Sequence, residues 1–461
     1  MRRLLLSLWA ALCLAGCASG GSVVSAPATG TSRIQELLRS YYPADQPGAI
    51  VLARRDGEVV LRSAYGLADL ELQAVLRPEH RMKIGSVTKS FTAAAVLALA
   101  TEGRLKLTDT IGTHLPDWPA ATREVTIEQL LTHRGGLREY TPLPEYSAAL
   151  RQDTTRAEML ALIGMQPAES APGTAFRYTN SAYFVLGAIV EKVTGGTLHD
   201  FVRSRFLEPL GLKDTTFDEI LKVIPKRVSG YGRQDGRVTN AQPYSPTRAF
   251  AVGDMLSTPD DLTRWIETLH GGTVPGISAE LLASAFESRR LPDGRDTGYG
   301  LGWFVNEFEG ARVVEHGGDL PGFSVHLLHI PQHRVTVAVL SNDAQHDPRP
   351  DFVATQVASF LIGKPWDPPA ASVPLSAAEL EPILGTYVSA TGAKRTILSE
   401  NGRLYLERNG RRTELAAAVA DRLFVPRSFV QFRFVPGASE ELELVLEQKG
   451  QEVDRGKRIR D

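Results

Sequence analysis

The order of strand-like and helix-like stretches restricts how the first part of this chain can fold. Two strand-like runs joined by a turn at Asp56-Gly57 lie between Gly48 and Leu61. A mostly helical middle follows, and strand-like runs return between Gly300 and Leu340. This order predicts an α+β fold in which both ends of the region contribute strands to one antiparallel sheet.

Apolar periodicity and helix-end residues place the main elements of this region. The expected helices cover Arg33–Tyr41, Phe91–Ala100, Ala182–Val193 (stopped by Gly195-Gly196), a segment starting at Thr258-Pro259, and Phe352–Ile362. The expected late strands are Gly300–Val305, Arg312–Glu315, Phe323–Ile330 and Arg334–Leu340.

The sequence changes character after residue 364. Residues 365–374 are rich in proline and predict a linker. Beyond them, Asn401-Gly402 and Asn409-Gly410 are strong hairpin signals between short strand-like runs. Residues 375–461 therefore predict a small antiparallel β domain, either a barrel or a sandwich.

The first residues are typical of an export signal. Met1-Arg2-Arg3 is basic, Leu4–Leu14 is almost wholly apolar, and small residues follow. We expect a signal peptide at 1–16. Leu14-Ala-Gly-Cys17 resembles the bacterial lipobox, which implies lipidation of Cys17, and the alternative is an ordinary signal cut near Ala18. Residues 17–31 then form a flexible tether, and an alanine after the cysteine implies an outer-membrane lipoprotein facing the periplasm.

Composition excludes several other function classes. The formal net charge of the 461 residues is −2, so nothing indicates a nucleic-acid surface. Both cysteines, Cys13 and Cys17, lie in the signal region. The sequence has no His-Glu-x-x-His motif and no glycine-rich nucleotide loop, so we expect neither a metal nor a cofactor.

Ser86-Val-Thr-Lys89 carries the strongest chemical signal. It opens the apolar helix that contains Phe91–Ala100, and residues three apart share a helix face. A lysine amine is a poor base unless burial lowers its pKa, and the apolar run after Lys89 makes burial plausible. A serine beside such an amine is an activated nucleophile. The alternative is a helix cap with an exposed lysine.

Two further motifs support the catalytic interpretation of Ser86 and Lys89. Tyr178-Thr-Asn180 stands in a loop just before a predicted helix, where a phenol and an amide can point into a cleft. His316-Gly-Gly318 lies between two strand-like runs, and its glycines allow a substrate backbone to approach closely. His133-Arg-Gly135 and His270-Gly-Gly272 match the same pattern but are expected in loops.

The order Ser-x-x-Lys, Tyr-x-Asn, His-x-Gly resembles the penicillin-recognising serine hydrolases, whose members include class C β-lactamases, D-alanyl-D-alanine carboxypeptidases, D-aminopeptidases and esterases. The stretches 130–137, 253–262 and 321–323 support this likeness. It implies an antiparallel sheet flanked by helices, together with a helical subdomain, in a hydrolase domain at 32–364. It also implies Ser86 as nucleophile, Lys89 as its base and Tyr178 as proton relay. Asn180, His316 and Gly318 would bind substrate, and the backbone N–H groups of Ser86 and Asp319 would form the oxyanion hole.

One departure from the family pattern bears on the substrate. Many β-lactamases have Lys-Thr-Gly where this chain has His316-Gly-Gly, so the groups that grip a drug's carboxylate are missing. We therefore expect weak β-lactam turnover and an acyl-enzyme mechanism on a peptide, amide or ester, as in a D-amino-acid peptidase or carboxypeptidase. An esterase, a true β-lactamase and a penicillin-binding sensor without turnover remain alternatives. The sequence leaves the oligomeric state and the role of the C-terminal domain open.

Overall fold

The computed structural model describes residues 29–366, 372–390, 392–408, 410–437, 441–448 and 451–459. The predicted signal and Cys17 lie outside these residues, as do all but the last three residues of the predicted tether. Those three belong to helix α1 (Thr29–Tyr41), so the first helix begins four residues before its predicted start. Within the described ranges, no helix is both long and apolar enough to span a lipid bilayer.

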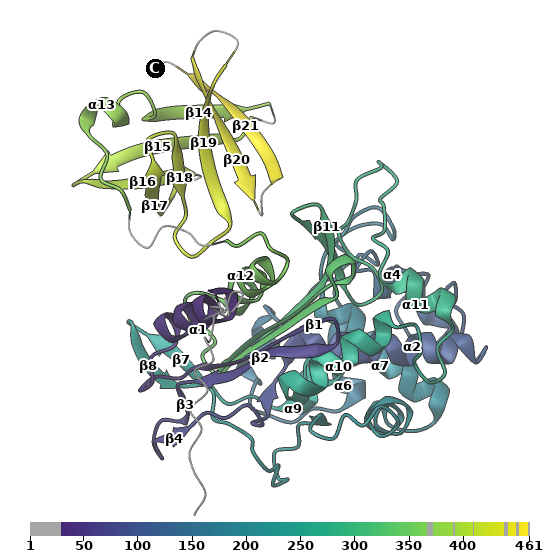
Figure 1. Ribbon diagram of the computed structural model, residues 1–461. Coiled ribbons are helices and arrows are strands. Elements are labelled where there is room, and N and C mark those ends of the chain that lie inside the picture. Colours follow the sequence, from purple (N-terminus) through teal and green to yellow (C-terminus); the bar gives the residue numbers. More distant parts are fainter. Residues whose placement is uncertain are drawn as a thin grey trace, which may run out of the picture.

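A six-stranded antiparallel sheet forms the centre of the larger part of the molecule (Figure 1). Its strands are β1 (Ala49–Arg55), β2 (Glu58–Tyr65), β10 (Phe304–Phe308), β11 (Ala311–Leu320), β12 (Phe323–Ile330) and β13 (Val335–Ser341). The strand order is β10-β11-β12-β13-β1-β2. Because β1 pairs with β13, with Ala49 opposite Ser341, the two ends of the region do share one sheet. The predicted α+β class is confirmed.

Helices cover both faces of this sheet, because its central strands are apolar on both sides. Every residue of β12 and β13 is buried. Successive side chains of a strand point to opposite faces. Val51 packs in a core with residues of α1 and α12 (Pro350–Leu361), whereas Ile50 belongs to the core of the helical body on the opposite face (Figure 1).

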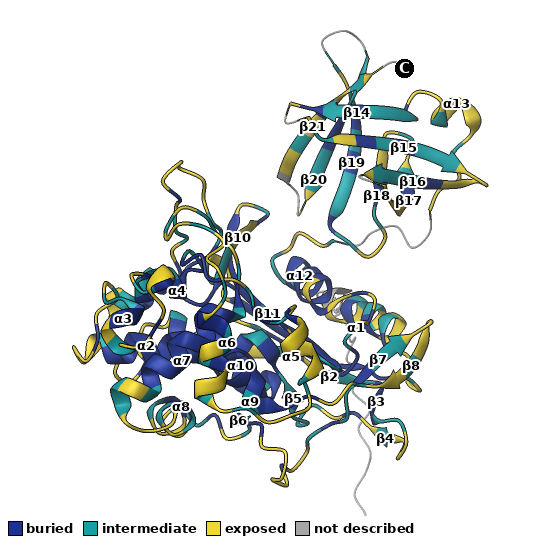
Figure 2. Cartoon of the chain, turned by 180° about the vertical axis from the view of Figure 1, so that it is seen from behind, coloured by how far each residue is buried: buried dark blue, intermediate teal, exposed yellow. Residues whose placement is uncertain are grey.

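The helical body is built around α2 (Thr88–Thr101), which is buried from Thr88 to Leu99 (Figure 2). The Phe91 ring stacks on Trp265 with centroids 4.2 Å apart, and Trp265 donates a hydrogen bond to Ser90. The other helices of the body are α3 (Ile111–His114), α4 (Ile127–Leu131), α5 (Pro144–Ala148), α6 (Arg156–Gly164), α7 (Asn180–Thr194), α8 (Leu198–Val202), α9 (Pro246–Ala249), α10 (Pro259–His270) and α11 (Ala279–Ala285).

Short strand pairs link the helices to the sheet region. They are β3 (Leu67–Asp69) with β4 (Ala74–Val75), β7 (Tyr231–Gln234) with β8 (Arg237–Asn240), and the trio β5 (Met82–Lys83), β9 (Met255–Ser257) and β6 (Thr216–Phe217). The predicted strand Gly300–Val305 is wrong in its first part, since β10 begins at Phe304. Gly302 has a φ of +92°, and a Cβ on Gly300 would lie 2.1 Å from the Ala285 carbonyl oxygen, so this segment is an irregular connection pressed against a helix.

The C-terminal part is a closed antiparallel barrel of eight strands. They are β14 (Gly385–Ser389), β15 (Lys394–Glu400), β16 (Arg403–Arg408), β17 (Arg411–Val419), β18 (Arg422–Phe424), β19 (Val430–Pro436), β20 (Leu442–Gln448) and β21 (Gln451–Ile459), preceded by α13 (Ala377–Leu380). Asn401 and Gly402 both have positive φ between β15 and β16, as their hairpin signal predicts. Asn409 lies outside the described residues.

The barrel meets the larger part of the molecule at α12. The Phe429 ring lies 4.9 Å from Phe352 of α12 and 5.1 Å from Trp366. Arg427 forms an ion pair with Asp347 at 2.8 Å beside this contact. The helix therefore packs on the sheet with one side and receives the barrel with another (Figure 1).

Candidate active site

Ser86 and Lys89 lie together where the chain enters the buried helix. Ser86 occupies the 3₁₀ turn η1 (Gly85–Val87), and Lys89 is the second residue of α2. The Lys89 Nζ lies 2.9 Å from the Ser86 Oγ. The lysine is fully buried, whereas the serine is only partly buried. The Ser86 hydroxyl, which a substrate can reach, therefore contacts the Lys89 amine, which water cannot reach.

Burial sets the charge of this amine. Removal from water lowers the pKa of Lys89 to about 7, with the negative charge of Glu139 acting in the opposite direction. About half of such amines are neutral at pH 7. The Nζ also contacts the Asn180 Oδ1 at 2.7 Å and the Val252 carbonyl oxygen at 3.2 Å, the latter from the turn η4 (Phe250–Val252).

Glu139 fixes the orientation of Asn180 and was missed by sequence reasoning. The Asn180 Nδ2 donates to Glu139 at 3.1 Å, and the Asn180 backbone N–H donates to the same carboxylate at 2.5 Å. Thr141 N–H donates a third hydrogen bond at 3.0 Å. With its amide nitrogen held by Glu139, Asn180 can only present its oxygen to Lys89. The glutamate follows the stretch 130–137, and that position was the one available hint.

Tyr178 covers the lysine from the side of α7. Its ring centroid lies 5.1 Å from the Lys89 Nζ. Burial raises the pKa of Tyr178, and the nearby Ser86 hydroxyl is the largest influence against that rise. In the described part of the chain the phenol has no hydrogen-bond partner within bonding distance. A buried phenol without a hydrogen-bond partner beside Ser86 is available to form a hydrogen bond with a bound molecule.

Two glycines bring strand β11 against the serine. A Cβ on Gly318 would lie 2.0 Å from the Ile84 carbonyl oxygen and 3.0 Å from the Ser86 nitrogen. Gly85 has a φ of +50°, and a Cβ there would lie 2.9 Å from the Asp319 nitrogen. Only glycine permits this approach. The backbone nitrogens of Ser86 and Asp319 are thereby neighbours, as an oxyanion hole requires.

His316 does not take the substrate-facing place expected from sequence. It is 1% exposed, its Nε2 lies 3.1 Å from the Tyr299 hydroxyl, and its Nδ1 lies 2.7 Å from the Gly317 carbonyl oxygen. Both ring nitrogens are occupied by protein groups, which leaves none for a ligand. Burial and the nearby lysine lower the pKa of His316 to about 3, so the ring is neutral. Its position indicates that the ring supports β11 from the protein interior.

The Asp319 carboxylate lies at the exposed end of β11. It accepts hydrogen bonds from Ser324 at 2.7 Å and from Arg349 at 3.0 Å. The Asp319 side chain thus links the end of β11 to Ser324 and Arg349, while its backbone nitrogen lies beside Gly85. Among the described residues, no group of three or more potential ligands is arranged to hold a metal ion.

Comparison with known proteins identifies the family of this chain. The family model described as Beta-lactamase matches residues 35–361, which include all of the residues described above. The chain belongs to the β-lactamase family. Members of this family with the β-lactamase fold are serine hydrolases.

Individual β-lactamase-family relatives extend over most of this chain. Penicillin-binding protein 4* of Bacillus subtilis (strain 168) is 26% identical over 451 residues, covering 91% of this chain and 97% of the relative. The octameric penicillin-binding protein homologue from Pyrococcus abyssi is 25% identical, with a TM-score of 0.67 and coverage of 93% and 98%. The D-amino acid amidase from Ochrobactrum anthropi SV3 shares the fold at 24% identity, with a TM-score of 0.62 and coverage of 73% and 98%.

A second histidine supports the site of this β-lactamase-family protein. His133 was expected to be an ordinary loop residue, and it does stand in a loop with a φ of +54°. Its ring is nevertheless buried and lies 4.3 Å from Tyr178 and 4.7 Å from Tyr299. Its Nδ1 accepts the Thr179 N–H at 3.2 Å, and burial keeps its pKa well below the usual range. His133 and His316 therefore form a neutral aromatic cluster with Tyr178 and Tyr299 beside Lys89.

Proposed function

We propose that this protein is a hydrolase in which Ser86 is acylated by a peptide, amide or ester substrate and Lys89 accepts the serine proton. The single observation that carries the proposal is the fully buried Lys89 Nζ at 2.9 Å from the Ser86 Oγ. A neutral amine at this distance can accept the hydroxyl proton as the oxygen attacks.

The remaining groups divide the later steps among them. The backbone N–H groups of Ser86 and Asp319 stabilise the negative oxygen of the tetrahedral intermediate. Tyr178 relays the proton that Lys89 took from Ser86 to the leaving group and so ends the step protonated, since its phenol is buried beside Ser86 and has no fixed partner in the described structure. Water then cleaves the acyl bond by the reverse sequence of proton transfers. Asn180 and Glu139 hold the lysine in place.

The charges around Ser86 favour a substrate whose acyl group has no carboxylate. Lys89 is used for catalysis, the His316 ring is neutral, and Arg349 is paired with Asp319 at 3.0 Å. This arrangement supports a D-amino-acid peptidase or amidase more than a β-lactamase, and the shared fold with a D-amino acid amidase is consistent with it. An esterase is the runner-up, because the same groups act equally on an ester carbonyl.

A penicillin-binding sensor is the alternative of another class. It is favoured by the similarity to a protein named for penicillin binding. Such a sensor forms the same acyl bond at Ser86 but releases it slowly. The stability of the acyl-enzyme, rather than its formation, separates the two functions.

Labelling with a fluorophosphonate probe tests the proposal. The wild type is expected to gain one adduct on the peptide that contains Ser86, Ser86→Ala is expected to gain none, and the exposed-serine control Ser204→Ala is expected to label normally. Absence of labelling in the folded wild type would overturn the proposal. A panel of D- and L-amino-acid p-nitroanilides and p-nitrophenyl esters then separates peptidase from esterase, and a burst without turnover identifies a sensor.

A further inference from the structure

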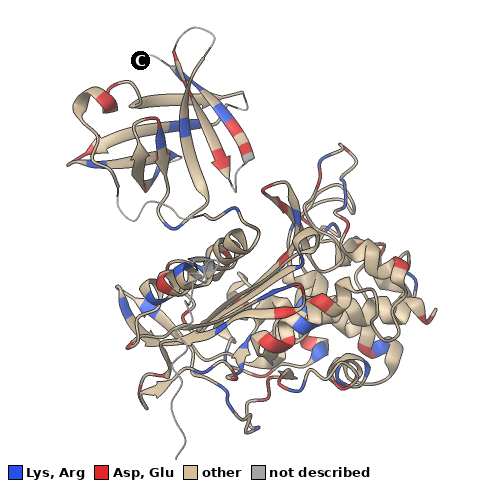
Figure 3. Ribbon diagram, viewed as in Figure 1, with Lys and Arg blue, Asp and Glu red and all other residues tan. Residues whose placement is uncertain are grey.

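The loop between β6 and β7 carries an unusual apolar tip. Ile220, Leu221 and Val223 are 57%, 98% and 90% exposed, respectively. Apolar side chains this exposed and this close in sequence form a patch, and such patches mark contact surfaces in soluble proteins. The loop projects from the edge of the body that lies away from the barrel and carries basic side chains (Figures 1 and 3).

The apolar tip is held in place by its own neck. One guanidinium nitrogen of Arg227 donates to the Asp218 carboxylate at 2.8 Å, and the other donates to the Lys222 carbonyl oxygen at 2.8 Å. Asp218 also pairs with Lys83 at 3.0 Å. Ile224 is buried and fixes the far side of the loop. These contacts keep the three apolar side chains in solvent instead of allowing them to fold back.

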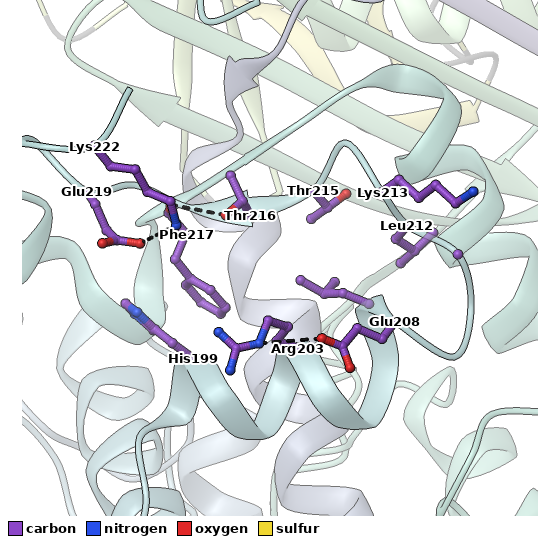
Figure 4. Close-up of a pocket in the computed structure, with 12 residues that line it drawn as sticks. His199, Arg203, Glu208, Leu212, Lys213, Thr215, Thr216, Phe217, Glu219 and Lys222 are labelled. Atoms are coloured by element: carbon purple, nitrogen blue, oxygen red, sulfur yellow. Dashed lines mark hydrogen bonds and ion pairs between the residues drawn. The ribbon is translucent and has the colours of Figure 1, made fainter. Parts of the chain in front are cut away.

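A cavity of about 430 Å³ opens directly behind this loop (Figure 4). Phe217 and Leu212 line it with apolar surface. Its charged groups have both signs: Arg203 and Lys222 are paired with the glutamates Glu208 and Glu219, and their side chains surround the opening in Figure 4. Lys213 at the same cavity has no ion-pair partner in the described structure.

We propose that this loop and cavity form a docking site for a phospholipid surface. The apolar tip enters the boundary between headgroups and acyl chains, while Lys222 and Lys226 remain at headgroup level. The cavity receives a zwitterionic ethanolamine headgroup. Its ammonium meets a glutamate of the cavity, and its phosphate stays at the rim beside Lys213, whose amine points away from the other lining side chains in Figure 4.

The predicted anchor favours a lipid partner over a protein. The lipidation expected at Cys17 would hold the chain at a membrane, and the residues from Cys17 to Thr29 would span at most about 40 Å. Docking through the loop would place the barrel on the aqueous side, since the two project from opposite ends of the molecule (Figure 1). This inference does not rest on the proposed catalytic function.

A fluorescent probe on the loop tests the docking. The only cysteines of the chain are Cys13 and Cys17, so Leu221→Cys gives a unique thiol in the acylated, processed protein. The matched control is Val419→Cys, an exposed apolar position on the barrel. Each labelled protein, with its acylation verified by intact mass, is reconstituted with phosphatidylethanolamine–phosphatidylglycerol vesicles that contain doxyl-labelled lipid as a quencher.

The expected result is at least threefold stronger quenching at position 221 than at position 419. Lys213→Glu is expected to reduce quenching at 221 by at least half, whereas Lys394→Glu on the barrel leaves it unchanged. A probe at 221 that is as solvent-exposed as the control overturns the proposal. So does a probe that is shielded but not quenched by the doxyl lipid, because it would be covered by protein.

Discussion

Replacement of Lys89 by methionine separates the free-energy cost of burying this amine from its role in catalysis. In the unfolded chain the lysine keeps its ordinary pKa, whereas in the folded protein burial lowers the pKa to about 7. Between pH 7 and the ordinary pKa, the unfolded state therefore binds one more proton than the folded state. Stability must rise with pH across this window.

The expected magnitude follows from the same shift. A change of one pKa unit corresponds to about 1.4 kcal/mol, so the free energy of unfolding of the wild type relative to Lys89→Met should increase by about 3 kcal/mol from pH 6 to pH 9. At pH 6 the variant should be the more stable protein, although it loses three hydrogen bonds worth about 1 kcal/mol each. Its hydrolytic activity should fall at least 1,000-fold, as is typical when an activating base is lost.

Denaturant unfolding followed by tryptophan fluorescence measures this difference mainly in the larger part of the molecule, because residues 375–461 contain no tryptophan and Trp366 is the residue that contacts the barrel through Phe429. The control Lys106→Met removes an exposed lysine and should show no pH-dependent difference from the wild type. The same stability difference between wild type and Lys89→Met at pH 6 and at pH 9 would refute the reasoning. It would mean that the buried amine stays protonated across this range and releases no proton.

Three further outcomes are expected. Glu139→Gln should lower kcat about 10- to 100-fold and move the rising limb of the pH profile of kcat/KM to lower pH, because the carboxylate raises the pKa of the buried lysine. Glu145→Gln is the exposed control. A rising limb that does not shift in Glu139→Gln would count against this role. Gly318→Ala should lower kcat at least 100-fold by displacing the strand that carries an oxyanion-hole N–H. Gly317→Ala should retain most activity, because the added Cβ would lie 3.4 Å from its nearest neighbour, the His326 Nδ1. Equal losses of activity in the two variants would contradict this prediction. Nitrocefin should be hydrolysed slowly, because the His316 ring is neutral and occupied, and efficient turnover measured by absorbance would overturn that expectation.

Local pattern was sufficient to predict that Ser86 and Lys89 lie together and to predict most of the sheet. Ser86 and Lys89 meet because helix geometry places residues three apart on one face, and this depends on nothing distant. The strands β12 and β13 are rich in apolar and β-branched residues, so their place in the sheet could be predicted, whereas the burial of Ser324, His326 and His329 could not. The predicted strand at Gly300 failed because its course is set by contact with Ala285, which sequence does not show.

Side-chain direction was the part that sequence could not supply. Glu139 and Asn180 are 41 positions apart, and their contact depends on how the segment between α4 and α5 packs against the start of α7. The pattern His-Gly-Gly marks the correct strand at His316, but the ring turns inward to Tyr299 because that side of β11 is enclosed. Burial of this kind is decided by tertiary structure and not by the motif.

The charge of the Lys89 amine is the claim on which the mechanism depends. It can be measured directly by NMR titration of protein labelled with ¹³C at the lysine Cε, with Lys89→Met used to assign the resonance. The account predicts a titration midpoint near pH 7 for this lysine. A midpoint at the ordinary value for lysine, above pH 10, would contradict it.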